Sequence, residues 1–211
     1  GIPYSYVSPR GYIETNVGGT LNVLDAAKEN NIEKLIHTST SEVYGTAEFI
    51  PITEQHPLNA QSPYSASKIA ADQLANSYYL SYGTPVVTLR PFNTYGPRQS
   101  LRAIIPTIIT QILNNSTRIR LGSLEPTRDF SYISDTVSAF VAALKNNKII
   151  GETINIGSGS EISIKKLTGL ILKASDKKIL ISSEERRKRP KKREVNRLFC
   201  SNKKALKLLN W

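Results

Sequence analysis

The sequence is poor in the residues that build disulfides, metal centres and membrane spans. Its 211 residues include no methionine, two histidines and one cysteine, Cys200. A single cysteine excludes an internal disulfide and favours a reducing compartment, so we expect a cytoplasmic protein. With so few imidazole and thiol groups, we predict no metal site. No apolar run approaches 18 residues and no signal peptide is recognisable, so we expect no membrane span.

Negative charge is scarce, and positive charge is unevenly distributed. The net charge is +11, and the run Arg186–Arg193 holds seven Lys or Arg side chains in eight residues. Such a run is compatible with a nucleic-acid patch, a localisation signal or a solvated loop. No aromatic side chains are interleaved with it for base stacking, so we favour the solvated loop and expect no nucleic-acid partner.

Hydrophobic periodicity predicts alternating helices and strands in the first part of the chain. We predict a helix from Tyr12 to about Asn30, a buried strand at 34–39, a helix at 62–82 and a strand at 85–90. Ser62-Pro63 is typical of a helix start and Gly83 of a helix end, and residues 46–62 are predicted to be a loop. This alternation predicts an α/β fold with a parallel sheet and crossover helices.

After Arg90 the predicted elements become shorter. We predict helices at 103–113, 134–145, 163–173 and 202–209, and strands at 119–121, 153–156 and 179–181.

The residues with useful chemistry gather at one strand end and at the next helix start. Residues 38–45 are Thr-Ser-Thr-Ser-Glu-Val-Tyr-Gly, and Tyr64 and Lys68 lie four residues apart, on one face of the predicted helix. A free phenol has a pKa of about 10 and is a poor base at neutral pH, but a nearby ammonium lowers that pKa. Such a phenol can exchange a proton with a substrate hydroxyl. Tyr-x-x-x-Lys alone is common, and the flanking segments at 38–45 and 90–98 make the pattern specific.

With these motifs the chain resembles the extended short-chain dehydrogenase/reductases that act on nucleotide sugars, and among them the NAD-dependent nucleotide-sugar 4,6-dehydratases. The likeness runs from Ile2 to Trp211, and residues 61–68 are most similar to the N-acetylglucosamine-type dehydratases that start legionaminic acid synthesis. The resemblance implies that residues 1–92 are the C-terminal part of an NAD-binding Rossmann domain. It implies that residues 93–211 are mainly a smaller, partly interleaved α/β substrate domain, with some segments returning to the Rossmann sheet. It also implies a homodimer of the complete protein, formed through helices 12–30 and 65–82.

The resemblance implies a role for each candidate catalytic residue. Tyr64 is expected to take the proton of the sugar 4-hydroxyl, Lys68 to hold the nicotinamide ribose and tune Tyr64, and Thr40 to bind the 4-oxygen. Glu42 is expected to remove the C5 proton so that water leaves from C6, and hydride return to C6 gives a 4-keto-6-deoxy sugar. Ser41 stands where many 4,6-dehydratases carry the aspartic acid that protonates the leaving hydroxyl. The acid is therefore Glu42 or a water held by Ser41.

Further residues are expected to contact the two ligands. The expected NAD contacts are Asn16, Thr38, Ser39, Tyr64, Lys68, Pro91 and Asn93. The expected nucleotide-sugar contacts are Thr40, Asn93, Arg98, Arg128 and Arg189, with Arg128 paired to the diphosphate because an arginine fork suits phosphate. Asn93 also has a simple interpretation as a turn residue, and Glu42 as a carboxylate at a helix N-terminus.

The glycine-rich strand–turn–helix with which this family holds the cofactor pyrophosphate is missing from the sequence. No Gly-x-x-Gly-x-x-Gly occurs, and the first residue is not methionine. We therefore expect an N-terminally truncated fragment.

Other activities compete with the dehydratase interpretation. A nucleotide-sugar 4-epimerase of this fold uses the same tyrosine and lysine but usually has a small residue in place of Glu42. A UDP-glucuronate decarboxylase usually has an arginine just before the tyrosine, where this chain has Pro63. A non-catalytic fragment or a basic binding module is the alternative of another class. We favour the dehydratase, a lyase that serves the synthesis of cell-surface glycan precursors.

Overall fold

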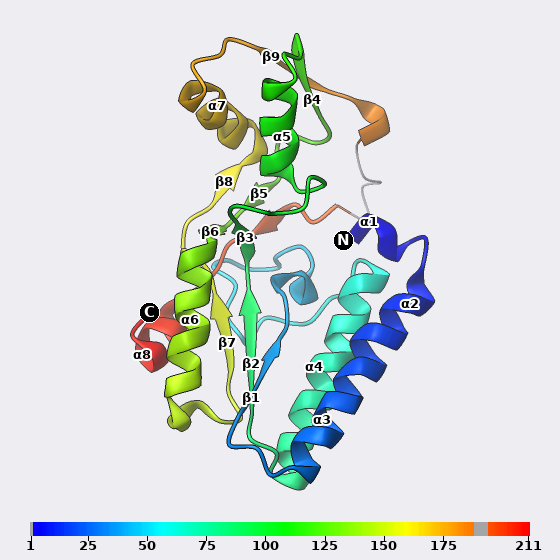
Figure 1. Cartoon of the computed structure of the whole chain (residues 1–211). Helices are drawn as coiled ribbons and strands as arrows, with labels where there is room; N and C mark the ends of the chain where they lie inside the picture. The colour runs from blue at the N-terminus through cyan, green and yellow to red at the C-terminus, as the bar shows by residue number, and fades with distance from the viewer. Residues whose placement is uncertain (1, 188–193) are drawn as a thin grey trace.

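A three-stranded parallel sheet lies at the centre of the lower half of the molecule (Figure 1). The computed structural model of the chain describes residues 2–187 and 194–211. The middle strand is β2 (Val86–Pro91), with β1 (Leu35–Thr38) on one side and β7 (Thr153–Ile156) on the other. The first five residues of β2 are all buried, as is typical of a central parallel strand. Among the described residues β1 pairs with β2 alone, so its outer edge is open.

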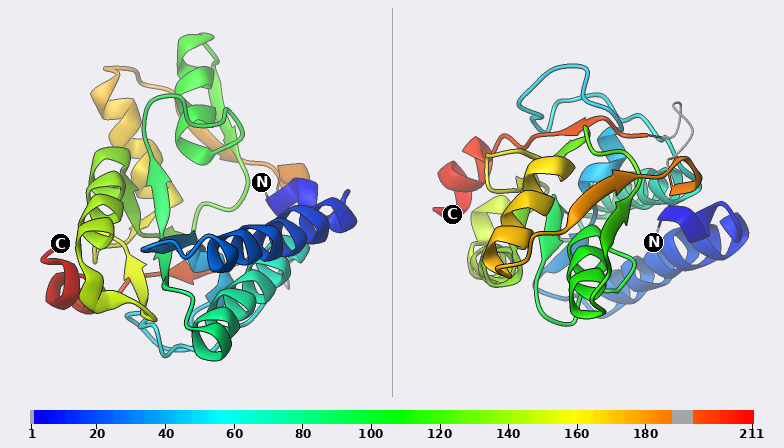
Figure 2. Two further views of the ribbon diagram at one scale, coloured as in Figure 1. Left: turned by 60° about the horizontal axis from the view of Figure 1, so that its bottom comes forward. Right: turned by 90° about the horizontal axis from the view of Figure 1, so that it is seen from above.

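Helices cover both faces of this sheet (Figures 1 and 2). On one face Val86 packs with Leu24 and Tyr78, and on the other Val87 packs with Ala139. Because successive strand residues point to opposite faces, β2 contributes to two cores at once. The covering helices are α3 (Gly19–Glu29) and α4 (Pro63–Tyr82) on the first face, and α6 (Ile133–Lys145) and α8 (Lys203–Leu209) on the second.

Helix α4 begins and ends where the sequence predicted. The Ser62 hydroxyl accepts the backbone N–H of Ser65 at 3.0 Å, and Pro63 occupies the first helical position. Gly83 ends the helix in the left-handed conformation, with φ 69° and ψ 14°. These caps place Tyr64 in the first turn, where it faces the carboxyl end of the sheet.

The helix predicted at Tyr12–Asn30 is wrong in its start and its regularity. The helical segment begins as α2 (Pro9–Ile13), continues as one π-helical turn, η1 (Glu14–Gly18), and ends as α3. Proline lacks a backbone N–H, and it suits the first helical turn because an N–H there has no partner within the helix. This explains the earlier start. A short helix, α1 (Ile2–Ser5), precedes it.

The remaining elements lie mainly beyond the carboxyl ends of β1 and β2, in the upper half of Figure 1. Here α5 (Ile104–Leu113) and α7 (Ile164–Ala174) pack on the parallel pair β4 (Arg118–Leu121) and β9 (Leu180–Ser183). The predicted elements after Arg90 all occur, with ends within two residues of those predicted. After residue 92 the chain adds β7 to the central sheet, and α6 and α8 pack on one face of that sheet.

Five very short strands and three 3-10 segments escaped prediction. Strand β5 lies between β8 and β10, and β3 pairs with β6. Strands of two or three residues are too short to show a period in the sequence. Among the described residues, no helix combines the length and the apolar character needed to cross a bilayer. The short elements are β3 (Asn93–Tyr95), β5 (Thr127–Arg128), β6 (Phe130–Tyr132), β8 (Ile162–Ser163), β10 (Arg197–Leu198), η2 (Ser41–Tyr44), η3 (Asn147–Ile149) and η4 (Glu185–Arg187).

Gly45 closes η2 in a conformation that side chains rarely adopt, with φ 64° and ψ −151°. A Cβ added there meets the carbonyl oxygen of Asn59 at 2.5 Å. We expect Gly45→Ala to lower the free energy of unfolding by about 2–4 kcal/mol, from backbone strain and the clash together. Gly83→Ala is the matched control, because its φ is also positive but nothing lies within 4 Å of the added Cβ. It should cost about 1–2 kcal/mol. Urea unfolding compares the variants, and equal losses would contradict the role of the clash.

Candidate active site

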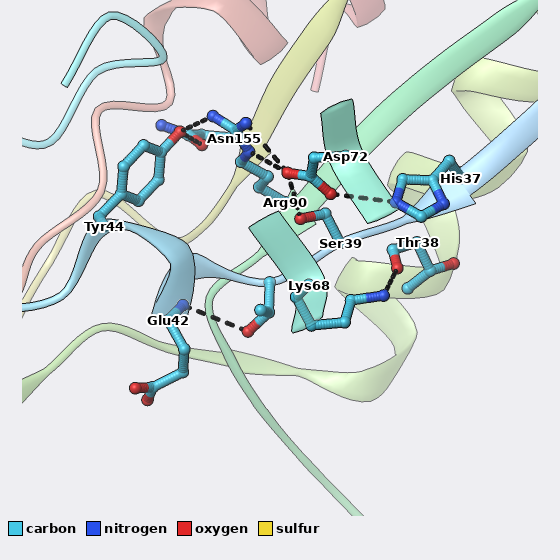
Figure 3. A network of polar contacts seen from close by, with 10 residues as sticks. His37, Thr38, Ser39, Glu42, Tyr44, Lys68, Asp72, Arg90 and Asn155 are labelled. Atoms are coloured by element: carbon cyan, nitrogen blue, oxygen red, sulfur yellow. Dashed lines mark hydrogen bonds and ion pairs between the residues drawn. The ribbon is translucent and has the colours of Figure 1, made fainter. Parts of the chain in front are cut away.

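Three of the predicted catalytic residues meet at the carboxyl end of β1. Thr40 follows the strand and caps η2, since its hydroxyl accepts the backbone N–H of Glu42 at 3.3 Å. The Thr40 side chain also lies close enough to the phenol of Tyr64 to lower its pKa. Lys68, one turn further along α4, donates from Nζ to the carbonyl oxygen of Thr38 at 2.6 Å (Figure 3). Tyr64, Lys68 and Thr40 therefore surround one strand end.

The ionisation of Tyr64 depends on its burial as well as on neighbouring groups. Burial raises the pKa of Tyr64 above its usual value, and the charge of Glu42 adds to the rise, while the Thr40 side chain opposes it. Burial lowers the pKa of Lys68, and the charge of Asp72 opposes that shift. In this structure burial is the largest influence on the Tyr64 pKa, and the Lys68 ammonium donates to the Thr38 carbonyl oxygen, so the tuning of Tyr64 by Lys68 stays a prediction. The phenol needs a further positive charge beside it to act as a base near neutral pH.

A cavity of about 650 Å³ lies between this strand end and the upper elements. Three predicted residues line it: Glu42, Asn93 and Arg128. Arg128 is only 8% exposed, donates to the carbonyl oxygen of Thr127 at 2.8 Å and lies 3.7 Å from the carboxylate of Glu194. This volume suits a ligand as large as a nucleotide sugar or a drug.

Three further arginines that sequence reasoning missed also line this cavity: Arg102, Arg120 and Arg187. Arg120 and Arg187 both pair with Glu184, at 3.6 and 3.1 Å. The alternating pattern of β4 shows in the sequence that Arg120 faces away from the buried Ile119. It does not show that Arg120 faces a cavity, because other walls of the cavity come from α5 and η4, which are distant in sequence. A wall with four guanidinium groups favours an anionic ligand with several oxygen acceptors.

A second, apolar groove of about 610 Å³ lies on the opposite face of the sheet, against α6. Two of the predicted cofactor residues, Thr38 and Pro91, line it together with Ile36 and Phe140. Strand alternation turns Ile36 and Thr38 to this face and His37 to the face covered by α4. Thr38 and Pro91 therefore lie on the face of the sheet opposite to α4, the helix that carries Tyr64 and Lys68.

The other predicted residues have more varied positions. Asn16, on the π-helical turn, donates from Nδ2 to the Ser67 hydroxyl at 2.9 Å, and that hydroxyl donates to the Tyr64 carbonyl at 2.7 Å. Ser39 is buried and donates to Asp72 at 2.8 Å. Ser41 is buried and is not among the residues that line the cavity.

Of the two remaining predicted arginines, the structure describes only Arg98, and Arg98 does not line this cavity. Arg98 is exposed, has a positive φ of 65° and is not among the lining residues. Arg189 lies outside the described residues. Within the described part of the chain, no group of three or more His, Cys, Asp or Glu side chains is placed to hold a metal ion.

The chain is similar in sequence to known nucleotide-sugar enzymes. Residues 1–211 match the protein family described as GDP-mannose 4,6 dehydratase. A dTDP-glucose 4,6-dehydratase from Streptomyces griseus is 37% identical over 164 residues, which are 78% of this chain and 50% of that protein. The chain spans about half the length of the curated relatives it matches.

Two solved structures are similar in fold and sequence. One is a UDP-glucuronic acid 4-epimerase from Bacillus cereus in complex with UDP-glucuronic acid and NAD, with a TM-score of 0.87 and 33% identity over 94% of this chain and 62% of that one. The other is a dTDP-glucose 4,6-dehydratase from Streptomyces venezuelae with NAD bound, with a TM-score of 0.87 and 29% identity over 100% of this chain and 64% of that one.

Proposed function

The chain belongs to the GDP-mannose 4,6-dehydratase family of short-chain dehydrogenase/reductases, and on that premise we propose that the whole protein to which these residues belong converts a nucleotide-activated hexose to its 4-keto-6-deoxy derivative. The observation that carries this proposal is Glu42. It lines the cavity two residues after Thr40, whose side chain lies near the phenol of Tyr64. A second acid–base group at the same strand end is what elimination across C5 and C6 requires and what epimerisation at C4 does not.

The proposed cofactor is NAD, which when bound accepts the hydride from C4 and later returns it to C6. The residues present fit its nicotinamide end. Lys68 and the exposed Thr38 lie at the carboxyl end of β1, and the raised pKa of Tyr64, caused first by burial, calls for the positive charge that oxidised nicotinamide carries. The pyrophosphate needs a glycine-rich turn, and we propose that another part of the protein supplies it against the open edge of β1.

The proton transfers follow from the positions of the side chains. Tyr64 takes the proton of the 4-hydroxyl while the Thr40 hydroxyl holds the 4-oxygen. The resulting ketone acidifies the C5 proton, which Glu42 removes as the C6–O bond breaks. The leaving hydroxyl gains a proton and departs as water. That proton comes from Glu42, which has just received one, or from a water near Ser41. When the hydride is returned to C6, C5 regains a proton, from solvent in the first case and from Glu42 in the second.

Arg128 is the proposed main contact of the substrate diphosphate, because it is the most buried of the four arginines that line the cavity. We expect Arg128→Gln to raise KM by about 10- to 100-fold, the value of a charge-assisted hydrogen bond. Arg118→Gln is the matched control, since Arg118 is exposed on β4 and does not line the cavity. Initial rates over a range of substrate concentrations measure both. A KM for Arg128→Gln equal to that of the control would refute the assignment.

Product mass separates the proposed reaction from its competitors. The whole protein is incubated with NAD and, separately, with UDP-glucuronate and a panel of GDP-, UDP-, dTDP- and CDP-hexoses, beginning with N-acetylglucosamine nucleotides because of the resemblance at residues 61–68. A dehydratase yields a product lighter by one water. An epimerase yields a product of unchanged mass with inverted C4, and a decarboxylase one that has lost carbon dioxide. Either of the last two results would overturn the proposal.

We propose that the whole protein is a homodimer joined through α3 and α4. Large apolar side chains are exposed on these helices, and Leu80 is 71% exposed. Others are Val23 and Tyr82. A cytoplasmic location and a role in supplying precursors of cell-surface glycans are part of the same proposal.

A further inference from the structure

A buried polar network lies directly behind the candidate active site (Figure 3). Its centre is Asp72, on α4 one turn beyond Lys68 and only 4% exposed. One carboxylate oxygen lies 3.0 Å from His37 Nε2, and the other accepts the Ser39 hydroxyl at 2.8 Å and Arg90 Nε at 3.1 Å. His37 and Ser39 come from β1 and its end, and Arg90 comes from β2. One side chain of the catalytic helix therefore holds two strands.

The network continues from Arg90 to the far end of η2. Arg90 Nη1 donates to the hydroxyl oxygen of Tyr44 at 2.9 Å, and the Tyr44 hydroxyl donates to Asn155 Oδ1 at 2.7 Å. The guanidinium also lies over the Tyr44 ring, 5.1 Å from its centroid. Tyr44 is fully buried, and Asn155 belongs to β7. All three strands of the central sheet are thus connected to Asp72.

These contacts hold both ends of the segment that carries the chemistry. Thr40 and Glu42 lie between Ser39, which binds Asp72 directly, and Tyr44, which binds it through Arg90. The same carboxylate stands on the helix that carries Tyr64 and Lys68. The distance between the two halves of the site therefore depends on one buried group.

The charge states suit this arrangement. Burial by itself favours the neutral acid, but the hydrogen bond from His37 and the charge of Arg90 hold the pKa of Asp72 below its usual value. Burial raises the pKa of Tyr44 to about 12, so its hydroxyl stays protonated and donates to Asn155. A buried ion pair contributes little to stability compared with well-packed apolar side chains, and fixing one geometry is a recognised use of such groups.

We propose that Asp72, acting through Ser39 and through the Arg90–Tyr44 pair, is a positioning residue that sets Glu42 and Thr40 against Tyr64 and Lys68. The inference rests on the function proposed above and deepens it. Its most specific consequence concerns Tyr44, which touches neither ligand site but fixes the end of the turn that presents Glu42.

The test is Tyr44→Phe in the whole protein, which removes one hydroxyl and keeps the ring beneath Arg90. We expect formation of the 6-deoxy product to fall by about 10- to 100-fold, the usual cost of a small misplacement of a reacting group. KM should change little. Oxidation at C4 should persist, because Tyr64 and Lys68 are untouched, so reduced NAD accumulates and is followed by its absorbance. Arg90→Lys should show the same pattern, since a single ammonium cannot reach both Asp72 and Tyr44 in the geometry of the fork.

A matched control and a double variant separate positioning from general weakening. Tyr78→Phe removes a hydroxyl that donates to Asp25 at 2.5 Å, two turns beyond Asp72 on the same helix. Tyr78→Phe should lower the melting temperature by about as much as Tyr44→Phe does. Reduced NAD should not accumulate during its reaction. If Tyr44 acts through Glu42, adding Tyr44→Phe to Glu42→Gln should cause no further loss of elimination. Two results would overturn the inference. One is a double variant whose loss of elimination rate is the product of the two single losses, and the other is a Tyr44→Phe variant in which oxidation and elimination slow equally.

The outcomes distinguish this inference from the proposed function. A wild-type protein that makes no 6-deoxy product would overturn both. A wild-type protein that dehydrates its substrate, with Tyr44→Phe working at the same rate, would overturn the inference alone.

Discussion

Tyr64→Phe is expected to lower kcat by about 10²- to 10⁴-fold, the range for loss of a general acid–base group. The substitution removes only the hydroxyl that is proposed to exchange a proton with the sugar. It leaves the ring in place, including its edge-to-face contact with Tyr12, at 5.9 Å between centroids. KM and melting temperature should therefore change little. Product formation by the whole protein with NAD and its substrate measures the effect.

The control for this substitution is Tyr78→Phe, which also removes a hydroxyl from α4 but far from the strand end. It should retain nearly full activity. A Tyr64→Phe variant with a rate within a few-fold of the wild type would show that another group accepts the 4-hydroxyl proton, and the assignment of the site would fall.

Glu42→Gln is expected to separate the two halves of the reaction. Glutamine keeps the shape of the side chain but cannot take the C5 proton, so the 6-deoxy product should form about 10²- to 10⁴-fold more slowly. Oxidation at C4 depends on Tyr64, Lys68 and Thr40 and should continue. The measurements are the absorbance of reduced NAD, which should accumulate, and the incorporation of solvent deuterium at C5, which should stop.

Glu48→Gln is the matched control, because Glu48 is an exposed carboxylate six residues further along the chain. It should behave as the wild type in both measurements. Formation of 6-deoxy product at the native rate by Glu42→Gln would refute Glu42 as the base. It would also remove the observation that favours a dehydratase over a 4-epimerase. Loss of C4 oxidation in the same variant would instead show that Glu42 shapes the site as a whole.

Much of the fold follows from short-range patterns. The apolar run and its bounds predict β2, and Ser62, Pro63 and Gly83 predict both ends of α4, because capping and helical spacing depend on residues within one turn of each other. The same locality brought Tyr64 and Lys68 to one face of α4, and the pairing of that helix start with the end of β1 followed from the α/β pattern.

Other features are decided by partners that are distant in sequence. Strand β10 exists because residues 197–198 pair with residues 127–128, and neither segment is long enough to show a period of its own. The cavity wall gathers Arg102, Arg120 and Arg187 beside Arg128 from three separate segments of the chain. The direction of the Tyr64 pKa shift is also decided by burial, which depends on everything packed around the phenol and not on the lysine four residues away.

The sequence by itself determined the family, the central alternation of helices and strands, and the identity of the residues at the strand end, since each depends on local spacing or on a contiguous motif. Only the tertiary structure decided which side chains share a cavity. It alone revealed Asp72 as the group that joins the catalytic helix to the segment carrying Glu42. From the sequence nothing distinguishes Asp72 from the other acidic residues of the chain. Its partners lie 18 to 35 positions away, and only folding, which sums many weak contacts along the whole chain, brings them within hydrogen-bonding distance.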